Sequence, residues 1–258
     1  AKIIKENPRN IRVITPDVGG GFGNKAFMYR EYPLLARAAK TLKKPVSWVQ
    51  ERNEHFLSCA QGRDNITVAE MALSKGGRFL AMRVDLIADL GAYLSQYAPY
   101  IPYLGGTMTT GCYDIPQAYF RVRGVYTHTT PVDAYRGAGR PEAAYLIERL
   151  VDQIAFETGS TPDKVRARNF VKPSQMPYAT PMGRVYDSGE FEAHMRRAME
   201  LADWAGFARR AAAAKKKGLI RGIGMGSYIE ACGGGSPEPA YIALDQDGGI
   251  TIKIGTQS

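Results

Sequence analysis

The sequence Ala134-Tyr135-Arg136-Gly137-Ala138-Gly139-Arg140 joins a run of strand-forming residues, 120–129, to a run with helical periodicity, 142–158. Glycines on either side of an alanine let a loop bring its backbone N–H groups close to a ligand. The two arginines carry planar, permanently charged groups that suit phosphate or other anionic oxygens. The stretch therefore predicts a strand–loop–helix unit whose loop binds an anion.

A second glycine cluster, Val18-Gly19-Gly20-Gly21-Phe22-Gly23-Asn24-Lys25, lies roughly a hundred residues upstream. With Ala26 it satisfies the G-x-G-x-x-A pattern of dinucleotide-binding proteins, and it stands between a strand-like and a helical run. The next strand ends near Glu51, about 28 residues after the motif, whereas the ribose-binding acid of that pattern follows at about 20. The glycine cluster thus has two interpretations. One is a loop that approaches another anionic group, and the alternative is a Rossmann-type dinucleotide-binding oxidoreductase domain.

The rest of the pattern is mixed, which predicts an α+β fold of mixed sheets and packed helices. Thr161 and Pro162 are typical of a helix start, and Ser74-Lys75-Gly76-Gly77 is typical of a hairpin turn. A glycine- and proline-rich stretch, 180–189, predicts a boundary between a first part, 1–180, and a second part, 181–258. Further helices are expected over 34–42, 191–202 and 207–217, and strands over 11–15, 46–50, 66–73, 79–88, 222–230, 241–245 and 250–254.

Composition narrows the class of protein. The 258 residues are 45% hydrophobic, enough for a sizeable core. The three cysteines have neither disulfide nor zinc-site spacing, which favours a reducing, cytoplasmic location. The formal charge of +9 is poorly clustered along the chain. Its densest part, 209–217, lies in an alanine-rich helical run without aromatic residues, so a solvated helix face is expected there rather than a nucleic-acid site. No apolar run reaches the ~20 residues needed to cross a membrane.

The two glycine loops, in this order and spacing, resemble the molybdenum-binding large subunit of the xanthine dehydrogenase and aerobic carbon monoxide dehydrogenase family. The resemblance covers nearly the whole chain and implies part of a molybdopterin-binding subunit. Five shorter motifs extend it: Glu51-Arg52-Asn53-Glu54-His55-Phe56, Asp89-Leu90-Gly91-Ala92-Tyr93, Tyr113-Asp114-Ile115-Pro116, Arg166-Ala167-Arg168-Asn169 and Tyr186-Asp187-Ser188-Gly189.

The resemblance implies the cofactor and the partners. Molybdenum is held by the sulfurs of a pterin, expected here in the cytosine dinucleotide form, so no protein side chain is expected as a metal ligand. Electrons leave through 2Fe-2S clusters on a small subunit and FAD on a medium subunit. A non-catalytic scaffold is a further alternative. The family's general-base glutamate and a Gly-Gln-Gly pterin loop are expected beyond Ser258, in the remainder of the large subunit, so this chain alone is expected to be inactive.

The resemblance also assigns roles to individual residues. Gly21, Phe22 and Gly23 match the loop whose backbone approaches the metal, and Tyr135 and Arg136 match a pair at the cofactor. Three residues, Gly137, Ala138 and Glu230, match positions beside the substrate.

Departures from the family pattern point to the substrate. Carbon monoxide dehydrogenases have a copper-binding cysteine where this chain has Gly137. Xanthine dehydrogenases have an acid and a phenylalanine where this chain has Ala26 and Ala138. An aldehyde or an N-heteroaromatic compound is therefore the expected substrate.

Overall fold

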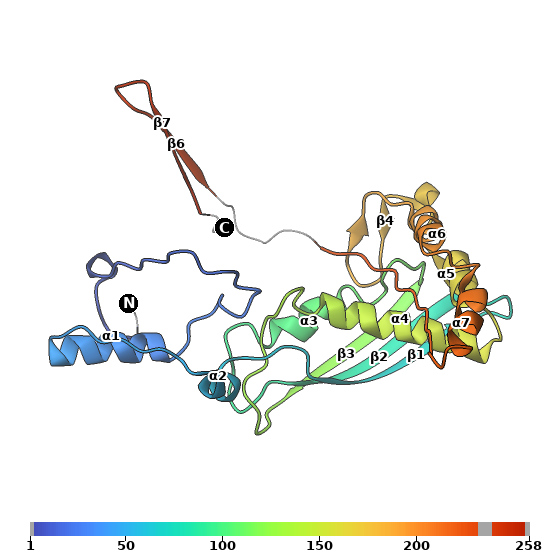
Figure 1. Cartoon of the computed structure of the whole chain (residues 1–258), viewed down its shortest axis with the longest axis horizontal. Coiled ribbons are helices and arrows are strands. Elements are labelled where there is room, and N and C mark those ends of the chain that lie inside the picture. The colour runs from blue at the N-terminus through green and yellow to red at the C-terminus, as the bar shows by residue number, and fades with distance from the viewer. Residues whose placement is uncertain (1–2, 232–238, 256–258) are drawn as a thin grey trace. The chain divides into compact units, whose positions relative to one another are not determined.

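The computed structural model describes residues 3–231 and 239–255 and divides into two compact units (Figure 1). The larger unit is Ala60–Glu230, and the smaller unit combines Ala1–Cys59 with Ala231–Ser258. The predicted boundary near residue 180 stays a prediction. The stretch 180–189 follows strand β4 (Tyr178–Ala179) and includes β5 (Val185–Tyr186), which pair as a short antiparallel hairpin inside the larger unit.

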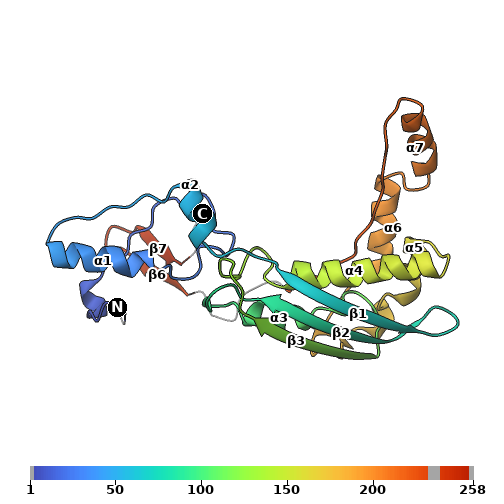
Figure 2. The ribbon, with the colours of Figure 1, turned by 90° about the horizontal axis from the view of Figure 1, so that it is seen from below.

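A three-stranded sheet forms the base of the larger unit, in the order β1 (Asn65–Leu73), β2 (Phe79–Asp89) and β3 (Gln117–Val125). β1 and β2 make the predicted antiparallel hairpin, whereas β3 is parallel to β2. The chain crosses between β2 and β3 through helix α3 (Tyr100–Gly106). The sheet is therefore mixed, and Figure 2 shows its three strands side by side.

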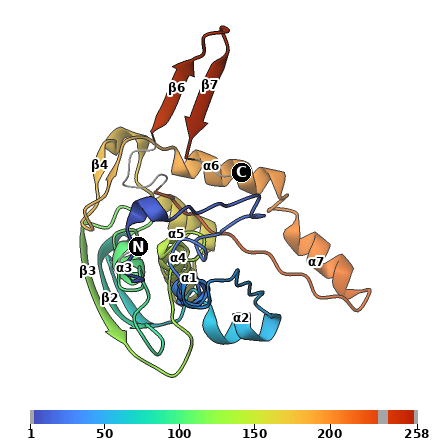
Figure 3. The ribbon, with the colours of Figure 1, turned by 90° about the vertical axis from the view of Figure 1, so that its left-hand side faces the viewer.

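Helix α4 (Arg140–Glu157) packs over this sheet, as its apolar spacing predicts. Ile147 and Val151 are fully buried, one helical turn apart, and belong to the same core cluster as alternate residues of β2 such as Val84 and Leu86. Figure 3 shows the sheet curving around α3 and α4. The start of α4, which directly follows the glycine loop, is therefore fixed by the main core.

The remaining helices of the larger unit confirm the sequence predictions. Helix α5 (Pro162–Asn169) starts at Thr161 with proline in its first turn. It is followed by the 3₁₀ turn η2 (Pro173–Gln175), α6 (Phe191–Leu201) and α7 (Phe207–Lys215). Among the described residues, no helix is long and apolar enough to cross a membrane.

The smaller unit contains little buried surface. Its elements are η1 (Pro8–Asn10), α1 (Glu31–Leu42), α2 (Arg52–Ser58), and the antiparallel strands β6 (Ala240–Leu244) and β7 (Ile250–Ile254). The predicted terminal hairpin is thus present. Phe27 is the one residue with a buried side chain in the described part of this unit.

Three predicted strands are wrong. Residues 11–15 and 46–50 have no regular structure, and Val13 is 83% exposed rather than buried. A strand requires neighbouring backbone for its hydrogen bonds, and none pairs with these segments in the described chain. Residues 222–230 do alternate in burial, but their Met225 carbonyl and Ser227 N–H bond to side chains instead of to another strand.

Candidate functional site

The loop between β3 and α4 adopts an unusual backbone. Gly137, Ala138 and Gly139 all have positive φ, of 93°, 45° and 93°. A Cβ on Gly139 would lie 2.2 Å from the carbonyl oxygen of Ile101, and one on Gly137 would lie 2.5 Å from the Pro141 ring. Glycine is therefore required twice, once for close packing on α3 and once for the start of α4.

The base of this loop is fixed by Asp133, which is almost fully buried. Its carboxylate accepts hydrogen bonds from the N–H of Tyr97 (3.0 Å) and of Ala134 (2.6 Å). Its own N–H donates to the carbonyl of Gln61 at 2.8 Å. Tyr135 and Arg136, which follow Asp133 and Ala134, are exposed. The loop thus presents these two predicted side chains from a rigid support.

Arg63 and Glu142 hold the loop from its other side. Glu142 accepts a hydrogen bond from the N–H of Gly139 at 3.0 Å, and Arg63 Nε lies 3.8 Å from the same carboxylate oxygen. Arg63 also donates to the carbonyl oxygen of Arg136, and its guanidinium lies 5.2 Å from the centre of the Tyr135 ring. Sequence reasoning missed Arg63, because it lies 72 residues before Tyr135 in the chain and no local pattern identifies it.

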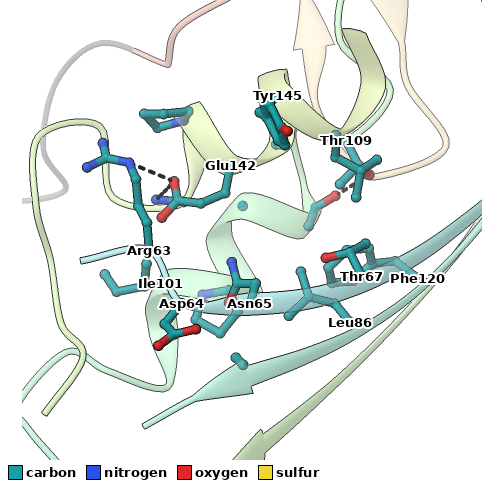
Figure 4. Close-up of a pocket in the computed structure, with 18 of the residues that line it drawn as sticks. Arg63, Asp64, Asn65, Thr67, Leu86, Ile101, Thr109, Phe120, Glu142 and Tyr145 are labelled. Atoms are coloured by element: carbon teal, nitrogen blue, oxygen red, sulfur yellow. Dashed lines mark hydrogen bonds and ion pairs between the residues drawn. The ribbon is translucent and has the colours of Figure 1, made fainter. Parts of the chain in front are cut away.

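A cavity of about 740 Å³ adjoins this loop in the larger unit (Figure 4). Arg63 and Glu142 lie at one end of it, joined by their ion pair. Apolar lining comes from Leu86 and Phe120 on the sheet and from Ile101 on α3. The cavity combines apolar walls with a charged end, as small-molecule sites commonly do.

Glu230 lies beside the same loop. Its Oε1 is 3.0 Å from Nε of Arg140, although the N–H does not meet hydrogen-bond geometry, so the contact is an ion pair. Arg140 also donates through its side chain to the carbonyl of Gly137 at 3.3 Å. The structure thus connects two of the predicted substrate residues, Gly137 and Glu230, through Arg140. Residues 232–238, which follow the segment that carries Glu230, lie outside the described residues.

A buried ion network fixes the segment that carries Glu230. Arg166 is fully buried and donates to Glu148 (2.7 and 3.0 Å) and to Asp152 (2.9 Å). Glu148 also accepts hydrogen bonds from the Tyr113 hydroxyl and from the N–H of Ser227. Burial, and then the Glu148 carboxylate, raises the pKa of Tyr113 far above its ordinary value. The motifs around Tyr113 and Arg166 therefore support the core.

The first glycine loop belongs to the smaller unit. Gly19, Gly20, Phe22 and Gly23 all have positive φ. Lys25 closes the loop on itself, because its ammonium group donates to the carbonyls of Val18 (3.0 Å) and Gly20 (2.9 Å).

The dinucleotide alternative predicts a strand before this loop and a helix directly after it. The described residues show neither: no strand precedes residue 21, and α1 begins only at Glu31. Gly21, Phe22 and Gly23 thus form one loop in this unit, and Tyr135, Arg136, Gly137 and Ala138 form another in the larger unit.

The titratable residues of the described chain include no group of three His, Cys, Asp or Glu side chains that could hold a metal ion. The Cys59 and Cys112 thiols are free.

Asp89 is buried, which opposes its ionisation, but hydrogen bonds from Gly91 and from two threonines outweigh burial and lower its pKa. Asp89 thus supports the strand end from which the chain continues toward α3.

Two curated relatives resemble the chain over most of its length. The large chain of carbon monoxide dehydrogenase from Hydrogenophaga pseudoflava is 36% identical over 87% of this chain and 29% of its own length. The large subunit of nicotine 6-hydroxylase from Paenarthrobacter nicotinovorans is 31% identical over 95% of this chain and 33% of its own. The chain therefore spans about a third of these relatives.

A solved structure has the same fold. Quinoline 2-oxidoreductase from Pseudomonas putida 86 superposes with a TM-score of 0.87 at 28% identity, covering 94% of this chain and 33% of the other. Models of the molybdopterin cofactor-binding domain match residues 1–170 and 197–258. The predicted α+β fold is thereby confirmed, and the dinucleotide-binding alternative is not favoured. The chain belongs to the molybdopterin-binding domains of the xanthine dehydrogenase and carbon monoxide dehydrogenase large-subunit family.

Proposed function

We propose that this chain is part of the molybdopterin-binding subunit of a molybdenum hydroxylase that oxidises an aldehyde or an N-heteroaromatic compound, with water as the source of oxygen. The observation that carries the proposal is the loop 134–140, in which three consecutive residues have left-handed backbone beside an exposed arginine. Such a loop suits an anionic ligand, because backbone N–H groups and a guanidinium can meet its oxygens together.

The residues present fit a molybdopterin held by hydrogen bonds. Gly21, Phe22 and Gly23 would approach it through the backbone of a loop with repeated positive φ. Tyr135 and Arg136 would bind it through the second glycine loop, with Arg136 as the charged group. The cofactor supplies the oxygen-transfer chemistry, and the proposal gives no protein side chain to the metal. The general base is assigned to the remainder of the large subunit.

The loop geometry supports a substrate other than carbon monoxide. A copper-binding cysteine would stand at residue 137, where any Cβ would lie 2.5 Å from Pro141 and would adopt a φ of +93°. Purine oxidation is disfavoured by Ala26 and Ala138, which offer neither a polar group nor a ring. The relatives named for nicotine and quinoline support an N-heteroaromatic substrate, and an aldehyde is kept as the alternative.

The proposal extends to the complex. The pterin is proposed in its cytosine dinucleotide form, with 2Fe-2S clusters on a small subunit, FAD on a medium subunit, and a cytoplasmic location. The partner subunits are supported by relatives that are named as a large chain, a large subunit or a subunit of a complex.

The test is metal, pterin and turnover analysis of the complete native complex. We expect molybdenum and a pterin cytosine dinucleotide without stoichiometric copper, and dye reduction with aldehydes or N-heteroaromatic compounds. Carbon monoxide should not reduce the clusters. A complex that lacks molybdenum, or that oxidises carbon monoxide, would contradict the proposal.

A variant pair tests Arg136 itself. Arg136→Lys keeps the charge but loses the two-pronged geometry, so the molybdenum content should fall. The exposed Arg209 on α7 gives the control, because Arg209→Lys should leave the content unchanged. Equal metal content in both variants would show that Arg136 does not hold the cofactor.

A further inference from the structure

Arg63 occupies an unusual position before β1. Its backbone has a φ of 62°, a conformation that residues with side chains seldom adopt without tertiary support. Its side chain is about two-thirds buried. The guanidinium extends to a loop more than 70 residues away, so its direction is set by the fold of the larger unit and not by local sequence.

One guanidinium makes three contacts with that loop and one with the first turn of α4. It donates to the carbonyl oxygen of Arg136 and approaches that of Tyr135 at 3.4 Å. It lies over the Tyr135 ring at 5.2 Å, which suits a cation–π contact. Its Nε lies 3.8 Å from Glu142, whose carboxylate accepts the Gly139 N–H. Arg63 and Glu142 thus hold the loop at both ends.

This loop requires such support. Ala138 has a φ of 45°, a backbone conformation that carries an energetic cost for a non-glycine residue. Within the loop two backbone hydrogen bonds oppose that cost, from the Ala138 N–H to the Tyr135 carbonyl (2.9 Å) and from the Arg140 N–H to the Gly137 carbonyl (3.2 Å). The carbonyl oxygen of Arg136 is met by Arg63, so this contact fixes the peptide between Arg136 and Gly137.

We propose that Arg63 is a positioning residue that orients the 135–139 loop for cofactor binding, acting through its backbone and the Tyr135 ring. The expected effect on cofactor binding rests on the proposed function, whereas the orientation of the loop is independent of any ligand. Lysine at this position would keep the charge and lose the planar group that meets two carbonyls, a ring and a carboxylate together.

The test compares Arg63→Lys and Arg63→Ala with Arg83→Lys. Arg83 is the matched control, because it lies on β2 in the same unit and forms an exposed ion pair with Glu70 at 3.5 Å. Hydrogen exchange of the full chain without cofactor is the first measurement. We expect peptides covering 135–139 to exchange about tenfold faster in both Arg63 variants, while β1 and β2 stay protected. Methylguanidinium should restore protection of this loop in the alanine variant and leave the exchange of the wild-type loop unchanged.

The second measurement is molybdenum and pterin content of the native complex, which should fall several-fold in Arg63→Lys and stay constant in Arg83→Lys. Unchanged exchange at 135–139 in Arg63→Lys would overturn the inference. Faster exchange throughout the larger unit would also overturn it, since Arg63 would then be a general structural residue. If wild-type complex contains no molybdenum but the loop still exchanges faster in the variants, the role of Arg63 in orienting the loop stands and the proposed function fails.

Discussion

Glu148→Gln should destabilise the larger unit much more than the same change at an exposed ion pair. Glu148 is 9% exposed and accepts hydrogen bonds from a fully buried Arg166, from Tyr113 and from the Ser227 N–H. Removing one partner of a buried pair costs about 3–5 kcal/mol, because the remaining charge is left in the interior. Asp152 still contacts Arg166, so we expect a loss of about 3 kcal/mol, at the lower end of that range.

Glu192→Gln is the matched control. Glu192 pairs with Arg196 one turn along α6, and both side chains are exposed, so its loss should be about 0.3–0.5 kcal/mol. The free energy of unfolding would be measured by urea titration of the full chain, with far-ultraviolet circular dichroism as the signal. That signal reports mainly on the larger unit, which contains α3 to α7.

Hydrogen exchange gives a second reading of the same change. The Ser227 N–H loses its charged acceptor in Glu148→Gln, so peptides from 222–230 should exchange faster than in wild type. A loss below about 1 kcal/mol, or equal losses in the two variants, would refute the argument that burial makes this pair strong.

Three further outcomes are expected. Gly139→Ala should reduce the free energy of unfolding, measured by urea titration, more than Gly159→Ala does. Both glycines have positive φ, which costs an alanine about 1–2 kcal/mol, but only at residue 139 would the new Cβ also lie 2.2 Å from a carbonyl oxygen. Equal losses in the two variants would contradict this. The lowered pKa of Asp89 means that its ionised form stabilises the fold above about pH 4 and that this contribution is lost as the pH falls through the folded pKa. Asp89→Asn should therefore cost about 1–3 kcal/mol at pH 7 and flatten the acid side of the stability profile. Burial raises the pKa of the Cys112 thiol to about 12, so iodoacetamide at pH 8 should modify Cys59 at least about 100-fold faster, as read by peptide mass spectrometry; equal rates would show an open core.

Elements with their own local pattern were predictable from the sequence. Helix α4 has apolar residues at helical spacing, and the β1–β2 hairpin has alternating residues around a glycine turn. The segments 11–15, 46–50 and 222–230 also carry a strand pattern but lack a strand partner. A strand pattern specifies which face can be buried, whereas the ladder depends on backbone elsewhere in the fold. These errors therefore share one physical cause.

The candidate site likewise has features that the sequence predicts and features that it does not. The glycines at 137 and 139 were visible, because a glycine pair in the sequence is enough to indicate close backbone approach. The reasons that they are required were not visible, since one involves the Pro141 ring and the other the Ile101 carbonyl on α3. Ala138 shares their left-handed backbone without being glycine, so its conformation must be enforced by the surroundings. The enforcing contacts come from Arg63 and Glu142, and only the second lies near the motif.

Holding this loop through distant side chains has a chemical consequence. A loop that depended on glycine alone would sample many conformations, and a ligand would have to select the competent one at a cost in affinity. Arg63 at one end and the capping Glu142 at the other reduce that freedom before any ligand arrives. The Arg140–Glu230 ion pair also connects the loop to the 222–230 segment. The Glu148–Arg166 network bonds that segment to the core. The exposed side chain of Arg136 is therefore carried on backbone that is tied to the sheet, to α4 and to α5, and changes at any of these ties should alter its position without removing its charge.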